Sequence, residues 1–88
     1  MKFMVTCTGK PAHFKVATSK FLKTGAAPPG GVKMLGRWHG PFTGWVVAET
    51  DDLKEVYEWT TQWSDLLEFT VVPVLEDAEL GDVLSKLA

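Results

Sequence analysis

The run Gly36-Arg37-Trp38-His39 contains the residues best suited to chemistry. If it is a strand, alternation puts Arg37 and His39 on one face and Trp38 on the other. A guanidinium holds a carboxylate or another anion by a planar fork, and an imidazole changes protonation near neutral pH. The pattern therefore suggests an anion-binding pair, with Trp38 as an aromatic neighbour. In the alternative interpretation, the run is an exposed edge strand with Arg37 and His39 in water and Trp38 in the core.

Few other side chains suggest a site. Thr6 could offer a hydroxyl to a ligand, and Trp63 belongs to an aromatic stripe that could line a pocket or form part of the core. Glu49 could form a cross-strand ion pair with Arg37. Cys7 has no cation close in sequence, so we expect a small buried hydrophobic residue and no nucleophile.

No catalytic motif is recognisable, so we assign no catalytic residue; His39 is the one candidate for a general acid or base. Ser64 has no partner base for a triad. Two histidines, one cysteine and no spaced carboxylate–histidine pair predict no metal site. The glycine-rich loop at 26–31 lacks the context and the lysine of a phosphate loop, so no cofactor is predicted.

The elements that would position these residues follow from the glycine and proline pattern. We predict strands at 2–8, 32–39, 45–50 and 68–75, helices at 12–24 and 52–65, and a last helix opening at Asp77. The order predicts an α+β, ferredoxin-like βαββαβ fold, with a four-stranded antiparallel sheet in the order 4-1-3-2 plus a C-terminal helix. Pro73 agrees with this topology, because a proline is tolerated in an edge strand.

Length and composition limit the class of protein. With 88 residues and 45% hydrophobic side chains, we expect one domain over 1–88. No stretch is long and apolar enough to span a membrane. The net charge of −2 argues against nucleic acid as a partner. A single cysteine is consistent with the reducing cytoplasm.

The predicted strands are apolar on both faces, which two helices cannot cover. Phe3, Val5 and Cys7 share one face of the first strand, and Met4 lies on the other. We therefore expect a homodimer, with the sheets of two copies facing each other. Alternatively, the C-terminal helix covers the second face and the chain is monomeric.

The segments at 3–6, 28–39, 46–52 and 58–69 resemble a family of short bacterial and phage proteins that is known only as a domain of unknown function. More loosely, the chain is similar to the dimeric α+β barrel superfamily, which includes small monooxygenases, muconolactone-type isomerases, haem-handling proteins and stress-responsive barrels. The resemblance implies the ferredoxin-like fold and the dimer but selects no activity.

These observations lead to one main functional hypothesis and two rivals. The main hypothesis is a homodimer that binds a small apolar or amphipathic ligand, fatty-acid-like or aromatic, between its two sheets. Its predicted ligand-binding residues are Thr6, Arg37, Trp38, His39 and Trp63. The first rival is a cofactor-independent monooxygenase or isomerase that uses His39. The second is a protein–protein interaction module whose second sheet face binds another protein.

Overall fold

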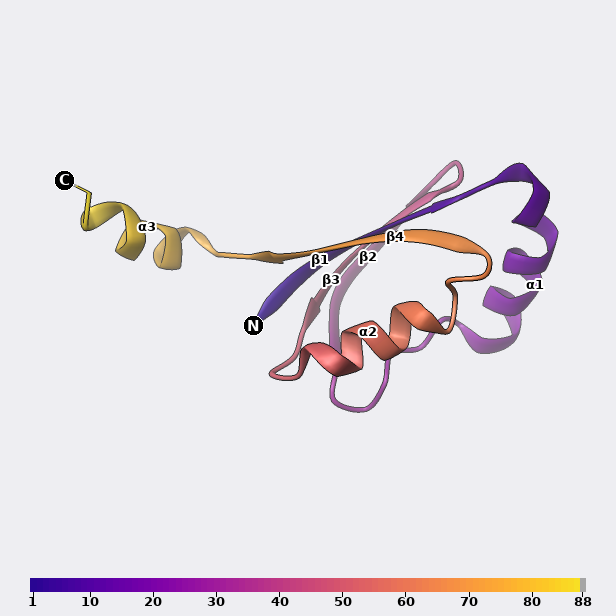
Figure 1. Ribbon diagram of the computed structural model, residues 1–88, viewed down its shortest axis with the longest axis horizontal. Coiled ribbons are helices and arrows are strands. Elements are labelled where there is room, and N and C mark those ends of the chain that lie inside the picture. The colour runs from indigo at the N-terminus through magenta and orange to yellow at the C-terminus, as the bar shows by residue number, and fades with distance from the viewer. Residues whose placement is uncertain (88) are drawn as a thin grey trace.

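The computed structural model describes residues 1–87 and follows the predicted order of elements. Figure 1 shows the sheet with α1 and α2 on one side and α3 extending away. The elements are β1 (Lys2–Gly9), a 3-10 turn η1 (Pro11–His13), α1 (Phe14–Thr24), β2 (Lys33–Gly40), β3 (Thr43–Glu49), α2 (Leu53–Thr61), β4 (Leu67–Val74) and α3 (Asp77–Ser85).

The four strands form one antiparallel sheet in the order β2-β3-β1-β4, as predicted. Strand β1 pairs with both β3 and β4, so the N-terminal strand lies inside the sheet, next to the last strand of the sequence. Pro73 lies in β4, an edge strand, where its missing N–H does not interrupt the sheet. This topology is that of the ferredoxin-like fold.

Local sequence signals explain where the helices begin and end. The Asp52 carboxylate accepts a hydrogen bond from the backbone N–H of Lys54 at 2.9 Å and caps the N-terminus of α2. Gly25 ends α1 in the left-handed conformation, with φ of 67°, and its N–H donates to the Phe21 carbonyl. Both signals are visible in the sequence, which is why these boundaries were predictable.

The core lies between the sheet and α2. Phe3 and Val5 of β1 pack with Val46 and Ala48 of β3, beneath residues of α2. Val56 of α2 is fully buried there. In contrast, none of the α1 side chains is buried, and α1 lies towards one end of the sheet (Figure 1). We call this side of the sheet the helix face and the other side the open face.

The open face is apolar at its centre and carries no helix within the described residues. Its middle rows place Val47, Met4 and Val72 in register, and Trp38 beside Trp45. The Trp38 side chain is 59% exposed. This arrangement matches the prediction that both faces of the sheet are apolar and that two helices cover one of them.

Helix α3 does not cover the open face. It continues from β4 away from the sheet (Figure 1), and every residue from Leu75 to Leu87 is exposed. The alternative in which the C-terminal helix closes the second face is therefore wrong. The nine residues of α3 extend away from the sheet and leave the open face uncovered. No helix among residues 1–87 is long and apolar enough to cross a membrane.

Candidate functional site

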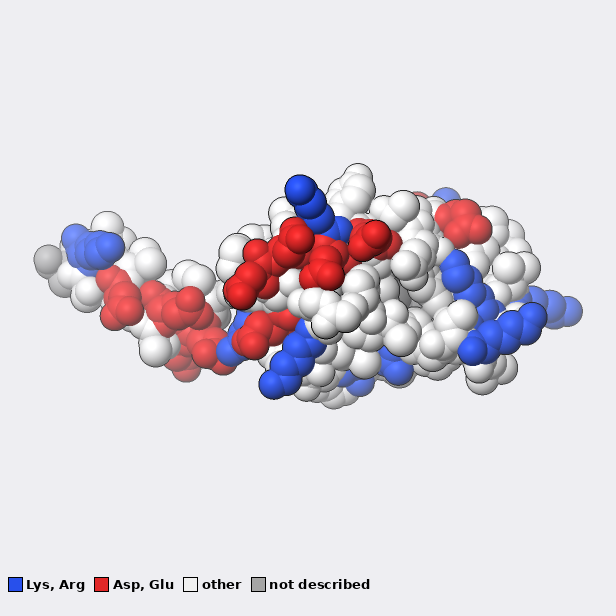
Figure 2. Space-filling model, turned by 90° about the horizontal axis from the view of Figure 1, so that it is seen from below, with Lys and Arg blue, Asp and Glu red and all other residues white. Residues whose placement is uncertain are grey.

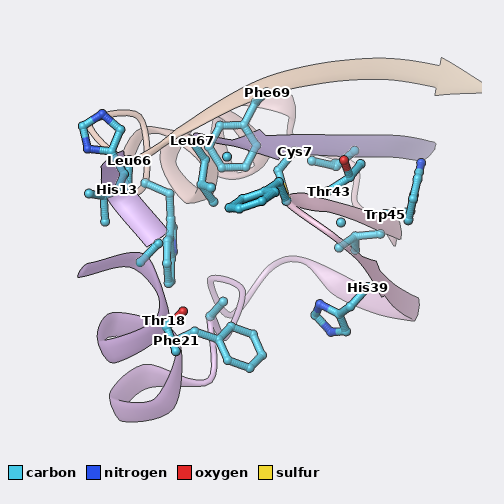
Figure 3. Close-up of a pocket in the computed structure, with 18 of the residues that line it drawn as sticks. Cys7, His13, Thr18, Phe21, His39, Thr43, Trp45, Leu66, Leu67 and Phe69 are labelled. Carbon is cyan, nitrogen blue, oxygen red and sulfur yellow. The ribbon is translucent and has the colours of Figure 1, made fainter. Parts of the chain in front are cut away.

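A cavity of about 290 Å³ lies between the helix face of the sheet and α1. In Figure 3, Cys7, Leu67 and Phe69 line it from the strand side, and Thr18 and Phe21 line it from α1. Its walls are overwhelmingly hydrophobic and aromatic. An apolar cavity with a few polar groups at its edge is the usual form of a small-molecule site.

Arg37 lies on the helix face and lines the cavity. Its Nη1 donates a hydrogen bond to the Gly25 carbonyl at 2.9 Å, so it holds a free carbonyl at the C-terminus of α1. Its guanidinium carbon is 5.1 Å from the centre of the Phe21 ring. No carboxylate lies within 4.0 Å of Arg37 among residues 1–87, which leaves further N–H donors for an anion.

His39 lies on the same face as Arg37, as the alternation predicts. Its ring meets the Phe21 ring edge to face at a centroid distance of 5.6 Å, and the two point toward each other in Figure 3. Phe21 therefore contacts both candidate anchor residues, Arg37 and His39. His13, at the start of α1, also lines the cavity.

Trp63 is buried and lines the cavity from the segment after α2. The Lys20 Nζ lies 4.7 Å from its ring centre and donates a hydrogen bond to the Gln62 carbonyl. Trp59, one turn earlier, donates from Nε1 to the Ala26 carbonyl at 3.2 Å. The predicted aromatic stripe therefore serves both as core and as cavity wall.

Cys7 also lines the cavity and is half-buried. Burial raises the pKa of its thiol above the ordinary value of 9.0, and backbone hydrogen bonds at Gly44 and at Cys7 itself oppose this only in part. A raised pKa keeps the thiol protonated at neutral pH, so Cys7 is not an activated nucleophile. The sequence analysis expected a small buried residue here, and the structure shows a half-buried one.

The charged groups around the cavity share one sign. Its lining includes Lys10, His13, Arg37 and His39, and no aspartate or glutamate. Lys10 forms an ion pair with Glu68 at 3.5 Å, whereas Arg37, the other permanently charged lining residue, has no acidic partner within the described residues. The cavity is thus apolar inside with positively chargeable groups along its walls.

Phe42 is a cavity residue that the sequence analysis missed. It occupies the β2–β3 turn with φ of 55°, a left-handed conformation that costs an aromatic residue about 1–2 kcal/mol. Its ring meets the Phe14 ring edge to face at 5.6 Å, and its carbonyl accepts a hydrogen bond from the Gly9 N–H at 2.7 Å. An aromatic residue inside a Pro-Phe-Thr-Gly turn, where glycine would be easier, was the available signal.

The predicted ligand-binding residues do not form one cluster. Arg37, His39 and Trp63 line the cavity, whereas Thr6 and Trp38 belong to the open face. The alternative interpretation placed Arg37 in water and Trp38 in the core. The structure shows the opposite, because Arg37 faces the helices and Trp38 is exposed on the open face. Strand alternation separates Arg37 from Trp38 but cannot say which face the helices cover.

The cavity lies within one chain, on the helix face, whereas the sequence analysis placed the ligand in the space between two sheets. One further expectation needs correction. Glu49 does not pair with Arg37: it is on the open face, 4.0 Å from the Lys2 Nζ. A bulge between Met34 and Gly36 shifts the register of β2 against β3, and this irregularity was not visible in the sequence.

No group of three or more His, Cys, Asp or Glu side chains within residues 1–87 is arranged to hold a metal ion.

The sequence matches the family model described as "Domain of unknown function (DUF3303)" over residues 1–88. The chain belongs to this family. The family resemblance predicted from the sequence is therefore confirmed.

The other comparisons add little about chemistry. No curated protein matches the sequence. Among solved structures, the chain is similar to one described as a "putative antibiotic biosynthesis monooxygenase" from Deinococcus radiodurans. The identity is 11% and the TM-score 0.48, over 86% of this chain and 94% of that one. A likeness at this distance carries no inference about activity.

Proposed function

We propose that this member of the DUF3303 family is a homodimer that binds a small amphipathic acid, with its apolar body in the helix-face cavity and its carboxylate on Arg37. We take residues 1–88 as one domain, since β1 pairs with both β3 and β4. We also propose a cytoplasmic location, where its one cysteine would stay reduced.

The observation that carries this proposal is the charge of the cavity lining. Eleven acidic residues outnumber nine basic ones in the chain, yet no carboxylate lines the cavity. The interior disfavours a ligand without an apolar body, and the cationic groups favour one with a negative end. An apolar carboxylic acid satisfies both conditions.

The apolar open face supports the proposal of a second copy. Its central rows carry two indoles and three aliphatic or thioether side chains, which would lose water on contact with a matching surface. The charges of this face lie at its two ends and are balanced there: Lys33 is opposite Glu49 at one end, and Glu68 forms an ion pair with Lys10 at the other. Among the described residues, the centre of the face therefore carries no charged side chain. A second copy would present an uncharged apolar centre of the same kind, which supports it as the occupant.

Isothermal titration with decanoate and with decanol tests the ligand proposal. Decanoate should bind more tightly, and Arg37→Gln should raise its Kd about 10- to 100-fold through the loss of a charge-assisted hydrogen bond. Decanol binding should hardly change in the same variant. Lys54→Gln, which removes an exposed cation from α2 that does not line the cavity, is the matched control and should leave both affinities unchanged.

The comparison of acid with alcohol also separates two roles of Arg37. This side chain holds the Gly25 carbonyl, so its loss could loosen α1. A loosened α1 would weaken decanoate and decanol binding to the same extent. That equal loss, or an absence of decanoate binding by the unaltered protein, would exclude Arg37 as the carboxylate anchor.

One observation favours an enzyme as the second candidate: His39 lines the cavity and contacts Phe21. In a cofactor-independent oxygenase or isomerase it would act as general acid or base. None of the hydrogen bonds within residues 1–87 orients its ring, which makes binding the better supported function. Turnover of an enolisable aromatic substrate with a pH profile that disappears in His39→Ala would favour the enzyme.

A further inference from the structure

The charges of this chain are divided between its two halves. All eleven acidic residues lie at or after Glu49, and seven of the nine basic residues lie before it. The fold keeps part of this division in space: Figure 2 shows acidic side chains along α3 and over the middle of the molecule and mostly basic ones towards the α1 end, with a basic group also at the tip of α3 and an acidic one near the α1 end. The molecule is therefore electrically polar along its 51 Å long axis.

Helix α3 is an amphipathic helix without a surface to pack on. It exposes three apolar side chains on one stripe, Leu80, Val83 and Leu84. An isolated helix shorter than about 12–15 residues is barely stable in water, and α3 has nine. Its base is fixed by the Lys2 Nζ, 2.5 Å from the Glu76 Oε1. A helix with these properties needs a covering partner to persist.

The α1 end of the molecule presents the opposite features. Helix α1 carries Lys15, Lys20 and Lys23 and no acidic residue. Leu22 is 78% exposed, and Phe14 is also exposed beside the cavity that both residues line. This surface combines positive charge with uncovered apolar side chains, whereas α3 combines negative charge with an apolar stripe.

We propose that α3 of one copy docks over α1 and the cavity of a second copy, so that each chain closes the ligand site of its partner. The proposal rests on the homodimer described under the proposed function. The chain's own α3 lies at the far end of the molecule from its own α1 (Figure 1). A second copy with its long axis reversed brings the two together.

The charges select this arrangement over one in which two α3 helices pack side by side. Glu76, Asp77, Glu79 and Asp82 of each copy would then face the same acidic residues of the other. Like charges in contact destabilise an interface, and opposite charges specify it. Docking on α1 pairs the acidic helix with Lys15 and Lys23, which have no carboxylate within 4.0 Å in residues 1–87.

Disulfide cross-linking between two labelled populations tests this contact. In a Cys7→Ser background, one population carries Leu84→Cys and an affinity tag, and the other carries Leu22→Cys. Both substituted side chains are exposed, so the fold should tolerate them. Mild oxidation of the mixture should give a tagged 84–22 disulfide between chains, and it should form far more readily than 84–84 or 22–22 disulfides.

Charge reversal distinguishes a specific contact from a disulfide that forms by random collision of two chains. Asp82→Lys should lower the 84–22 yield about two- to fivefold, as expected for one surface ion pair, and Lys23→Glu on the other chain should restore it. Asp65→Lys, which reverses an exposed acid outside α3, is the control and should leave the yield unchanged.

The outcomes separate this proposal from the dimer on which it rests. A sedimenting dimer without the 84–22 disulfide, or with 84–84 disulfides in its place, overturns the docking of α3 and leaves the sheet-to-sheet dimer intact. A monomer at micromolar concentration overturns both. If α3 does close the cavity, Leu84→Asp should weaken decanoate binding several-fold while the dimer persists.

Discussion

The two faces of the sheet are built from alternate residues of the same strands, yet they differ in shape and in charge. On the helix face, Gly44 brings the backbone of β3 close to Cys7, and α1 is separated from the strands by the cavity. On the open face, Trp38 lies over Gly36 and Trp45 over Gly40, so that the indoles form a broad apolar surface. The same alternation thus produces a hollow on one face and a contact surface on the other.

A charge on the open face should give the largest effect. Val47→Asp places a carboxylate in the central row beside Met4, where a second copy would bury it. An unpaired buried charge costs about 3–5 kcal/mol, which corresponds to a rise of roughly 10²- to 4 × 10³-fold in the dimer Kd. Analytical ultracentrifugation over a range of concentrations measures this Kd.

The matched control for Val47→Asp is Tyr57→Asp, which adds the same charge to an exposed position of α2. It should leave the dimer unchanged. Circular dichroism should show that Val47→Asp keeps its secondary structure. If both variants sediment like the unaltered protein, the open face is not the interface, and the contrast between the two faces loses its functional meaning.

Substitution of Gly44 or Gly36 by alanine should affect the two faces differently, one through the stability of the fold and the other through the stability of the dimer. At Gly44, an added Cβ would lie 2.9 Å from the Cys7 sulfur, in the buried helix face. We expect overpacking there to lower the free energy of unfolding by about 1–3 kcal/mol. At Gly36, an added Cβ would lie 2.5 Å from the end of the exposed Trp38 indole, which can move outward. Gly36→Ala should therefore weaken the dimer and largely spare the fold.

Urea unfolding and ultracentrifugation of the same variants distinguish these two results. Gly30→Ala is the control, because an added Cβ at this position would meet nothing within 4 Å. It should change neither quantity. An equal loss of unfolding free energy in Gly36→Ala and Gly44→Ala would mean that both faces act as one packed core.

The sequence predicted the elements and their order because each had a local cause. The capping of α2 by Asp52, the end of α1 at Gly25 and the edge position of Pro73 all depend on residues close in the chain. Which side of β2 the helices cover depends on the crossover connections and on the bulge after Met34, and neither is visible in residue types. The face of Arg37 therefore remained undetermined.

The candidate site was predicted only in part, for the same physical reason. Arg37 and His39 were recognised as a pair because alternation in a strand is local. The participation of Phe42 and His13 depends on where α1 lies, and α1 carries no buried residue that would fix its position in advance. Alternation also predicts that Trp38 and Arg37 lie on opposite faces of β2. The predicted ligand site included both residues and was inconsistent with this alternation.

The rates at which cysteines at positions 6 and 7 are alkylated should differ least, but they compare the two faces most directly. Cys7 lines the cavity, and Thr6, the residue before it, belongs to the open face. The raised pKa of Cys7 leaves less thiolate at pH 8 than in free cysteine, so iodoacetamide should modify it more slowly, and faster as the pH rises. Decanoate at three times its Kd leaves about a quarter of the sites empty and should slow this reaction about fourfold.

Thr6→Cys in a Cys7→Ala background should behave in the opposite way. Its alkylation should respond to dilution, which dissociates the dimer and exposes the open face, and decanoate should have little effect. Mass spectrometry of both proteins over time gives the two rates side by side. If decanoate protects position 6 and leaves position 7 unprotected, the ligand lies between the sheets and the assignment of the two faces is reversed.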